Sequence, residues 1–503
     1  MSIKKDTFKN AAYGILMQAL MVPLQFVSRW ITLKYIGVEI LGIGGTIASF
    51  IGMMSLADAG FGTAIMFSLF KPLEEHDVDR VNKLVNVFRL IYSLMAVFVL
   101  TVGVLLIPFL TYLLKNVTIT PYVLAIYLIM CVSTASSYLL GYKRTLLYAD
   151  MKEYISKKVD ITCETLFCVL NLVCIWIFKN YIAVVLVSLT KTLTSNIIIH
   201  LICRKRYPYL KRGKIDYSVT REIITQSKNL FAGKLAAYVY SSTDNILISS
   251  FTGAVHVGML SNYTLVSENL KKVAVMLLGP VTPAIGRLQV QHPDVESKQK
   301  LFAKYHQIAY LLAYVLVVPM LVLTDSFVCN MFGSEYVMSP VIKWLLAGIV
   351  YIYIAPFAYG DFITTSGLFQ VLYRVEMAGA VSNLVISVIG VAAWGVPGVL
   401  LGTVISGSIQ WCMRCSAVCR QVLQMDSKAC RRWGYKEVYR VALVLLSVWV
   451  ASGITSWIHC RIYLLEFVIH GVICVLTAVA VYCLLYRFDD KMTVASIKEL
   501  LRR

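Results

Sequence analysis

Long apolar segments recur along the whole sequence, and they constrain its fold more than any other feature. A helix needs about 20 mainly apolar residues to cross a bilayer, and fourteen windows meet that condition. Their apolar residues do not alternate with a period of two, so they predict membrane-spanning helices rather than the strands of a barrel. The windows are 11–34, 40–69, 86–112, 121–142, 159–178, 181–203, 230–250, 255–286, 305–324, 339–363, 372–393, 396–422, 439–458 and 462–486.

The composition agrees with a chain that folds in a bilayer. Hydrophobic residues make up 58% of the 503 residues, and only 15% are charged. Soluble domains usually have about 45–50% apolar and about 25% charged residues. The formal net charge is +20, which in a soluble protein would suggest a nucleic-acid partner.

The distribution of Lys and Arg explains this charge in another way. If the N-terminus is cytoplasmic, 37 of the 47 lie in cytoplasmic segments or toward the cytoplasmic ends of the windows, and three, Lys115, Lys179 and Arg461, lie outside. Cytoplasmic loops of membrane proteins collect positive residues, so the split predicts cytoplasmic N- and C-termini and argues against a nucleic-acid partner. The other seven lie inside the windows: Arg29, Lys34, Lys191, Lys234, Lys271, Lys272 and Lys343.

A glycine-bounded hexapeptide occurs twice, as GVEILG at 37–42 and GAVHVG at 253–258. Each joins two windows, and the offset of 216 residues corresponds to six windows plus one basic linker. Because six is even, both halves enter the membrane in the same direction, which predicts a parallel repeat. The expected fold is an all-α polytopic membrane protein of about 14 helices, with two six-helix bundles around a central cavity and an extra C-terminal helix pair. The expected boundaries are 1–203 and 230–424 for the bundles, 204–229 for the basic cytoplasmic linker, and 425–503 for the helix pair and cytoplasmic tail.

Three stretches carry a resemblance to a known family: VSRWITLKYIGVEILGIGG, SLADAGFGTAIMFSLFKPLEEHD and TDNILISSFTGAVHVGMLSNYTL. They resemble the flippases of bacterial O-antigen, capsule and exopolysaccharide gene clusters, in the multidrug/oligosaccharidyl-lipid/polysaccharide exporter superfamily. The resemblance implies a multi-pass protein of the bacterial cytoplasmic membrane. Its implied activity is to move an undecaprenyl-diphosphate-linked oligosaccharide from the inner to the outer leaflet by alternating access. Membrane lipids, a glycan polymerase and glycosyltransferases of the same pathway are the implied partners.

Cations inside the windows are candidates for binding such a substrate. Ionisable groups within a span are costly and usually face a cavity or an opposite charge, and Lys or Arg can replace the solvation of a diphosphate. Lys191 has no acidic neighbour within one turn of its own helix, which makes it the strongest single candidate. For Arg29 the alternative is snorkelling beside Trp30, and for the polar residues it is helix packing. The substrate-binding candidates are Arg29, Lys191, Lys234, Lys271, Lys272, Asn245, Asn262 and Tyr263.

Acidic residues inside the windows are candidates for coupling transport to an ion. Asp244 and Glu268 are expected near mid-membrane and Asp58 nearer the cytoplasm, and each could bind H⁺ or Na⁺. Glu268 could instead form an ion pair in its own helix with Lys271 or Lys272. The membrane potential is another energy source, because it favours outward movement of a negative headgroup. We expect no cofactor and no metal site.

Two other functions remain open. A cation-coupled multidrug or small-molecule antiporter of the same superfamily would share the fold, although its cavity is expected to be acidic. An enzyme is disfavoured, because the predicted external loops are short and no phosphate loop, zinc spacing or nucleophile elbow is recognisable.

Most of the thirteen Cys lie in or beside apolar windows and are expected to be buried hydrophobes. Gly279-Pro280 is expected to interrupt its helix.

Overall fold

All regular secondary structure in the part of the chain that the computed structural model describes is helical. No strand occurs among these residues, and ten of their helices are long and apolar enough to cross a membrane. The chain is therefore a multi-pass membrane protein. The described residues are 21–54, 68–69, 72–73, 75–150, 152–211, 213, 243–291, 294–458 and 462–486.

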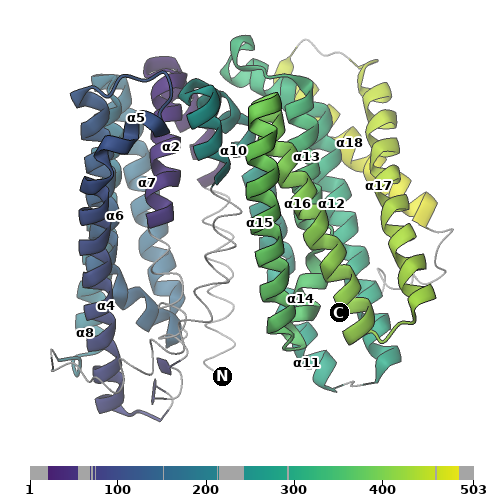
Figure 1. The fold of residues 1–503 in the computed structure, drawn as a ribbon, viewed down its shortest axis with the longest axis horizontal. Coiled ribbons are helices and arrows are strands. Elements are labelled where there is room, and N and C mark those ends of the chain that lie inside the picture. Colours follow the sequence, from purple (N-terminus) through teal and green to yellow (C-terminus); the bar gives the residue numbers. More distant parts are fainter. Residues whose placement is uncertain are drawn as a thin grey trace. The chain divides into compact units, whose positions relative to one another are not determined.

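The chain forms two compact units, Met1–Gly258 and Met259–Arg503. In the first unit (Figure 1), α6 packs against α4 and α8, and α8 packs against α7. The bundle boundaries predicted at 203 and 230 stay a prediction, since residues 214–242 lie outside the described part. The helices of this unit are residues 21–35, α2 (Val38–Met54), α4 (Val78–Leu105), η2 (Ile107–Phe109), α5 (Leu110–Leu113), α6 (Pro121–Ala149), α7 (Glu153–Phe178), α8 (Tyr181–Arg206), residues 243–252, and the start of α10 (Ala254–Leu278).

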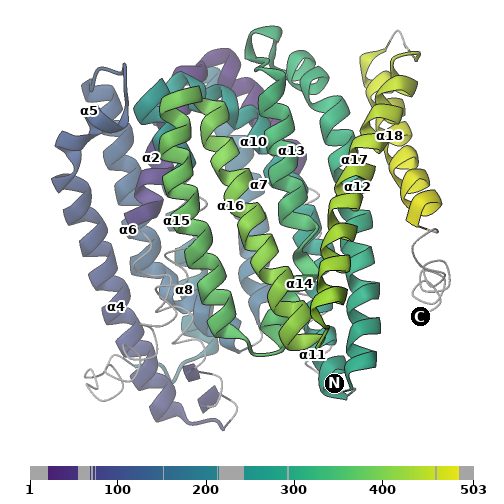
Figure 2. The ribbon, with the colours of Figure 1, turned by 45° about the vertical axis from the view of Figure 1, so that its right-hand side comes forward.

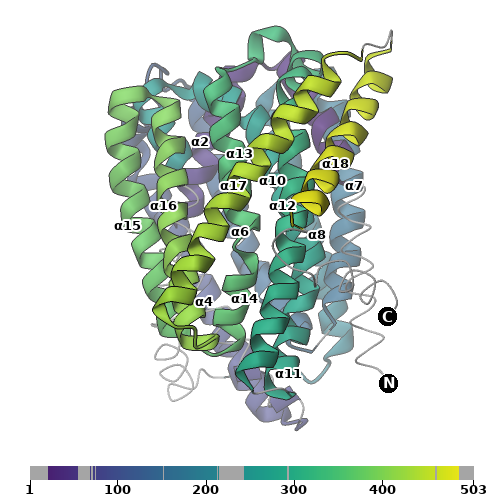
Figure 3. The ribbon, with the colours of Figure 1, turned by 90° about the vertical axis from the view of Figure 1, so that its right-hand side faces the viewer.

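In the second unit, α12 contacts α13, α14, α17 and α18. Figures 2 and 3 show α17 and α18, the extra helix pair, alongside α12. The helices that follow α10 are η3 (Gly279–Val281), α11 (Thr282–Gln291), α12 (Val295–Phe332), η4 (Ser334–Tyr336), α13 (Pro340–Ile354), α14 (Phe357–Thr365), α15 (Phe369–Trp394), α16 (Val396–Ala417), the π-helix η5 (Val418–Val422), α17 (Ser427–Thr455) and α18 (Tyr463–Tyr486).

Several helices continue beyond their apolar windows, and side-chain caps mark where they begin. Asp294 accepts a hydrogen bond from the Ser297 amide at the start of α12, and Asp426 accepts one from the Ala429 amide at the start of α17. Such caps satisfy amides that have no partner in the first turn. With 38 residues, α12 is about 57 Å long at 1.5 Å per residue, so it extends beyond a hydrocarbon core of about 30 Å.

Glycines let α15 and α16 approach closely. A Cβ added at Gly398 would lie 1.9 Å from the Gly390 carbonyl oxygen, and one added at Gly390 would lie 2.5 Å from the Gly398 oxygen. Nearby, a Cβ at Gly402 would lie 2.3 Å from the Ser387 hydroxyl. Small residues at such crossings are typical of membrane helices, because association there depends on packing rather than on hydrophobic burial.

The two glycine-bounded hexapeptides fold alike and contact each other in the first unit. Gly37 and Gly253 both adopt positive φ, +96° and +102°, which glycine tolerates without a steric penalty. A Cβ at Gly42 would lie 1.8 Å from the carbonyl oxygen of Ala254, and one at Gly258 would lie 2.1 Å from that of Val38. The two contacts are equivalent at the 216-residue offset. The repeat seen in the sequence is therefore a reciprocal backbone contact between α2 and the start of α10.

The predicted interruption at Gly279-Pro280 is confirmed. A 3₁₀ turn at Gly279–Val281 separates α10 from α11, as expected where proline removes a backbone donor. The π-helix η5, which widens the helix immediately after α16, was not predicted.

Candidate functional site

A network of charged and polar side chains joins α6, α7 and α8 in the first unit. Arg144 on α6 donates two parallel hydrogen bonds to Asp160 on α7, at 2.8 and 2.9 Å. Its Nη2 also donates to the Ser195 hydroxyl at 2.6 Å, and its Nε donates to Asn196 Oδ1 at 2.8 Å. Ser195 in turn donates to Asp160 at 2.9 Å. A planar guanidinium suits this fork-like geometry, which a lysine could not reproduce.

A second ion pair lies one turn further along the same helices. Lys191 Nζ on α8 is 2.6 Å from Glu164 Oε1 on α7. Residues four apart lie on one helix face, so Glu164 follows Asp160 along α7 and Lys191 precedes Ser195 along α8. We call this set the ionic ladder; it consists of Arg144, Asp160, Glu164, Lys191, Ser195 and Asn196.

The ladder is neutral overall and partly accessible. Its two cations balance its two carboxylates, and all four charged side chains are between 28% and 36% exposed. An ammonium group has three donors, and Lys191 uses one of them on Glu164. No other hydrogen bond or ion pair of Lys191 occurs within the described residues, so its remaining donors are available to a ligand.

The opposite face of α7 is apolar and exposed. Leu166 and Val173 lie two and nine residues beyond Glu164, which places both about 180° around the helix axis at 3.6 residues per turn. Their exposed fractions are 63% and 45%. Lys191 is ten residues from the first residue of α8, or about 15 Å along the axis. If α8 begins at the membrane surface, as the apolar window that starts at 181 predicts, Lys191 is near the middle of a hydrocarbon core about 30 Å thick.

The candidate cation Arg29 is half-buried on the helix over residues 21–35. It interacts electrostatically with Tyr181, the first residue of α8. On the same helix, Lys34 lies over the rings of Trp30 and Tyr35, at 5.1 and 5.7 Å. These contacts do not test the substrate role of Arg29, which stays a prediction.

Two neighbouring candidates lie on the helix over residues 243–252. Asn245 Nδ2 donates to the Ser49 hydroxyl on α2 at 3.0 Å, so this amide links the two helices. Asp244 also takes part in polar interactions. Asp58 and Lys234 lie outside the described residues.

The candidates Asn262 and Tyr263 on α10 are fully buried. The Tyr263 hydroxyl donates to Asp325 on α12 and accepts from the Met338 amide, both at 3.1 Å. Asp325 also pairs with Lys343 on α13. Both amide atoms of Asn262 lack a hydrogen bond within the described part of the chain, which is costly for a buried group.

Two of the three charged candidates on α10 form an ion pair, as the spacing allowed. Lys271 Nζ pairs with Glu268 Oε1 at 2.8 Å and lies 5.6 Å from the centre of the Tyr353 ring. Lys272 is exposed. Glu268 is 56% exposed, so it remains accessible to an ion or a substrate.

Sequence reasoning singled out Lys191 but did not pair it with Glu164, and it missed Arg144 and Asp160. Arg144 was assigned to a cytoplasmic segment, and the structure places it in α6, which continues to Ala149. The four-residue spacing of Asp160 and Glu164, on one helix face, was the signal that could have found the acidic half.

The profile of the polysaccharide biosynthesis protein family matches residues 7–289, more than half of the chain. The chain belongs to this family. None of the curated protein sequences compared with it matches.

Solved structures share the fold of this family member at low sequence identity. The lipid II flippase MurJ in an inward closed conformation matches with a TM-score of 0.71 and 12% identity, over 94% of this chain and 98% of that one. An inward-facing MATE multidrug resistance transporter of the MOP superfamily matches with a TM-score of 0.61 and 13% identity, over 82% and 99%. A MOP superfamily transporter from Pyrococcus furiosus matches with a TM-score of 0.55 and 14% identity, over 84% and 97%. The fold is thus that of MurJ and MATE transporters.

Proposed function

We propose that the chain is a flippase of the bacterial cytoplasmic membrane. It carries an undecaprenyl-diphosphate-linked oligosaccharide from the inner to the outer leaflet by alternating access, for assembly of a surface polysaccharide. The observation that carries this proposal is the ionic ladder, in which accessible Lys191 lies on the side of α7 away from its exposed apolar face. Charged groups exposed to hydrocarbon are costly, so this side of the first unit faces water or substrate.

The ladder suits a transient anionic substrate. Glu164 neutralises Lys191 while no substrate is present, and an arriving diphosphate oxygen takes up the remaining donors of Lys191 without requiring the pair to separate. An ammonium binds phosphate as a point charge, without a fixed angle, which allows release on the other side. The headgroup would meet the other candidate cations at other depths; these are Arg29, Lys234, Lys271 and Lys272.

The energy source and the partners complete the proposal. An inside-negative potential favours outward movement of the negative headgroup by roughly 2.3 kcal/mol per charge per 100 mV. Coupling to H⁺ or Na⁺ would place the ion at Asp58, Asp244 or Glu268. Both termini are cytoplasmic in this proposal, near the glycosyltransferases that build the substrate, and the glycan polymerase receives the flipped product.

A cation-coupled multidrug or small-molecule antiporter is the second candidate. The two carboxylates of the ladder, Asp160 and Glu164, favour it, because they could bind a cationic substrate once their basic partners move away. The fold shared with a MATE multidrug transporter is compatible with it.

Depletion of the protein in its own host tests the proposal. Lipid extracts are analysed by mass spectrometry for diphosphate-linked glycans, and a plasmid supplies variants. We expect fully assembled lipid-linked oligosaccharide to accumulate, and wild-type protein but not Lys191→Gln to clear it. A double variant, Lys191→Gln with Glu164→Gln, keeps an amide pair at the same place and removes the cation. Lys205→Gln, exposed on the same helix, is the control.

The outcomes separate the two candidates. Failure of the double variant together with success of Lys205→Gln supports a cation that meets the substrate. If depletion causes no accumulation and instead makes cells sensitive to cationic drugs, the flippase proposal is wrong and the antiporter replaces it.

A further inference from the structure

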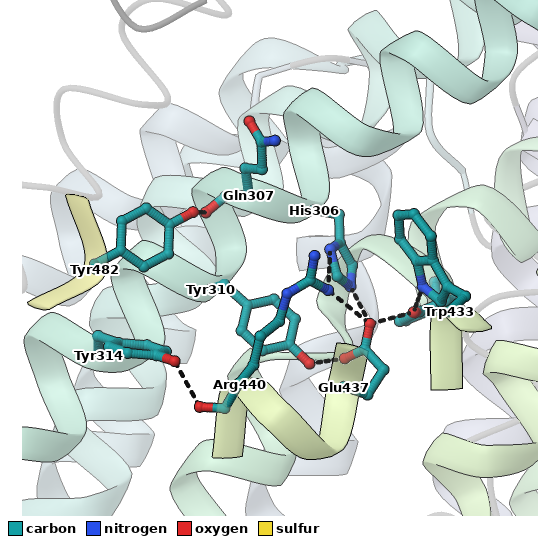
Figure 4. Close-up of polar contacts among 9 residues, drawn as sticks. His306, Gln307, Tyr310, Tyr314, Trp433, Glu437, Arg440 and Tyr482 are labelled. Atoms are coloured by element: carbon teal, nitrogen blue, oxygen red, sulfur yellow. Dashed lines mark hydrogen bonds and ion pairs between the residues drawn. The ribbon is translucent and has the colours of Figure 1, made fainter. Parts of the chain in front are cut away.

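A second charged cluster lies entirely within the second unit and holds α17 against α12 and α14. Figure 4 shows its members: His306 and Tyr310 from α12, and Trp433, Glu437 and Arg440 from α17. His306 is fully buried, and Glu437 and Arg440 are 8% and 3% exposed. Buried charges persist only when they are paired and hydrogen-bonded.

Glu437 is the hub of this cluster. Its Oε1 accepts a hydrogen bond from Arg440 Nη1 at 2.8 Å and another from the Tyr359 hydroxyl of α14 at 2.9 Å. Its Oε2 accepts from the Tyr310 hydroxyl. The carboxylate therefore ties three helices together, and His306 Nε2 lies 3.1 Å from the same Oε1.

The contact between Arg440 and His306 defines the protonation state of the imidazole. Arg440 Nη1 lies 3.3 Å from His306 Nδ1. A guanidinium can only donate, so Nδ1 must be the unprotonated acceptor. His306 is therefore neutral, with its single proton on Nε2, the nitrogen that faces Glu437.

This arrangement opposes a second proton on His306. A proton on Nδ1 would set two donors against each other, and it would place an imidazolium beside a guanidinium while both side chains are buried. The Arg440 guanidinium also lies over the rings of Tyr310 and Trp433, at 4.9 and 5.5 Å, so a displaced Arg440 would lose these contacts as well.

The groups that face His306 are known for each element packed against it. They are Tyr310 on α12, Tyr359 on α14, and Glu437 and Arg440 on α17. Phe302 and Trp433 supply apolar ring faces at 5.2 and 5.4 Å. Further out, Tyr351 of α13 contacts Tyr310, and Cys415 of α16 contacts Tyr359.

We propose that His306 is a proton-binding site whose occupancy controls how firmly α17 is held against α12 and α14. With His306 neutral, Arg440 bridges His306 and Glu437, and the segment of α17 between Trp433 and Arg440 is held against α12 and α14. Protonation of Nδ1 expels Arg440 from the imidazole and loosens the segment of α17 between Trp433 and Arg440. The ligand of this site is a proton, and the responding element is α17. The inference does not depend on the substrate of the transporter.

Hydrogen exchange on the full chain in lipid nanodiscs tests the loosening of α17. Peptides covering residues 427–445 are compared at pH 8 and pH 5, with exchange times scaled so that intrinsic exchange is equal. We expect at least tenfold faster exchange at pH 5 in the wild type and no such difference in His306→Gln, which accepts from Arg440 but cannot be protonated. His470→Gln is the matched control, because His470 lies on neighbouring α18 and contacts the Ile458 carbonyl at 2.9 Å.

A second measurement does not depend on how well the substituted cluster folds. The chain has seven histidines, and a variant without the other six leaves the cluster intact and gives ¹⁵N signals from His306 alone. At pH 8 these signals should show protonated Nε2 and bare Nδ1, and acidification should convert them to the imidazolium. A proton on Nδ1 at pH 8, or a pH-dependent exchange of α17 that persists in His306→Gln, overturns the proposal.

Discussion

The reciprocal contact between the two glycine turns makes a quantitative prediction about stability. Replacing Gly42 by Ala would put a Cβ 1.8 Å from the Ala254 oxygen, and the same change at Gly258 would put one 2.1 Å from the Val38 oxygen. Real Cβ atoms essentially never come closer than 3.0 Å. The two helices must therefore separate by at least 1.2 Å (3.0 − 1.8) for the first variant and 0.9 Å (3.0 − 2.1) for the second.

Two effects of the substitution act in opposite directions. Overpacking of this kind costs about 1–3 kcal/mol, whereas Gly→Ala in a helix interior gains up to about 1 kcal/mol. The variant Gly45→Ala separates the two effects. Gly45 lies on the same helix, but a Cβ there would meet its nearest neighbour at an ordinary 3.6 Å, so this variant gains helix propensity without overpacking. We therefore expect Gly42→Ala to be less stable than Gly45→Ala by about 1–3 kcal/mol.

Reversible unfolding in mixed detergent micelles, followed by circular dichroism, measures this difference. The double variant Gly42→Ala with Gly258→Ala should lose less than the sum of the single losses, because one separation of α2 from α10 relieves both contacts. Equal stability of Gly42→Ala and Gly45→Ala would refute the argument that the repeat is held by a close backbone contact.

Three further predictions concern other contacts and use the same unfolding assay. Asp325→Asn removes the charge that pairs with Lys343, whose side chain is only 15% exposed, and should lower the free energy of unfolding by about 1–3 kcal/mol. Glu296→Gln, in a pair exposed to water, is the control and should change it little. Equal effects of the two variants would contradict this. Gly398→Ala should destabilise the α15–α16 pair by about 1–3 kcal/mol, and unchanged unfolding would show that the pair can adjust. Asp426→Ala removes the cap of α17 and should cost about 1 kcal/mol, with Asp426→Asn as the conservative control that retains most of the stability.

The ends of the helices that face outward in the predicted topology could be predicted closely from the sequence. The windows that begin at 121 and 181 and the one that ends at 178 coincide with the ends of α6, α8 and α7. At the other side of the membrane the helices are longer than predicted, by seven residues for α6 and twelve for α17. The length of an apolar window reflects the thickness of the hydrocarbon core. The helix itself continues into water as long as its residues are good helix formers.

The charged sites were predictable only in part, because their partners come from other helices. Lys191 was singled out because no acidic residue lies within a turn of it on α8, but Glu164 meets it from α7. The pairing of Glu268 with Lys271 could be predicted, since both lie on one helix. His306 and Glu437 are separated by most of the second unit in sequence, and no local spacing indicates that α12 and α17 bring them together.

Flipping by the purified protein tests the central claim most directly. The chain is reconstituted into vesicles with a labelled polyprenyl-diphosphate oligosaccharide, and a membrane-impermeant enzyme that cleaves the glycan reports its exposure at the outer surface. The account predicts that wild-type vesicles expose the inner pool much faster than empty vesicles, and that the variant with Lys191→Gln and Glu164→Gln does not. Exposure at the same rate in empty and wild-type vesicles, under an imposed potential and with H⁺ or Na⁺ gradients of either sign, would contradict it.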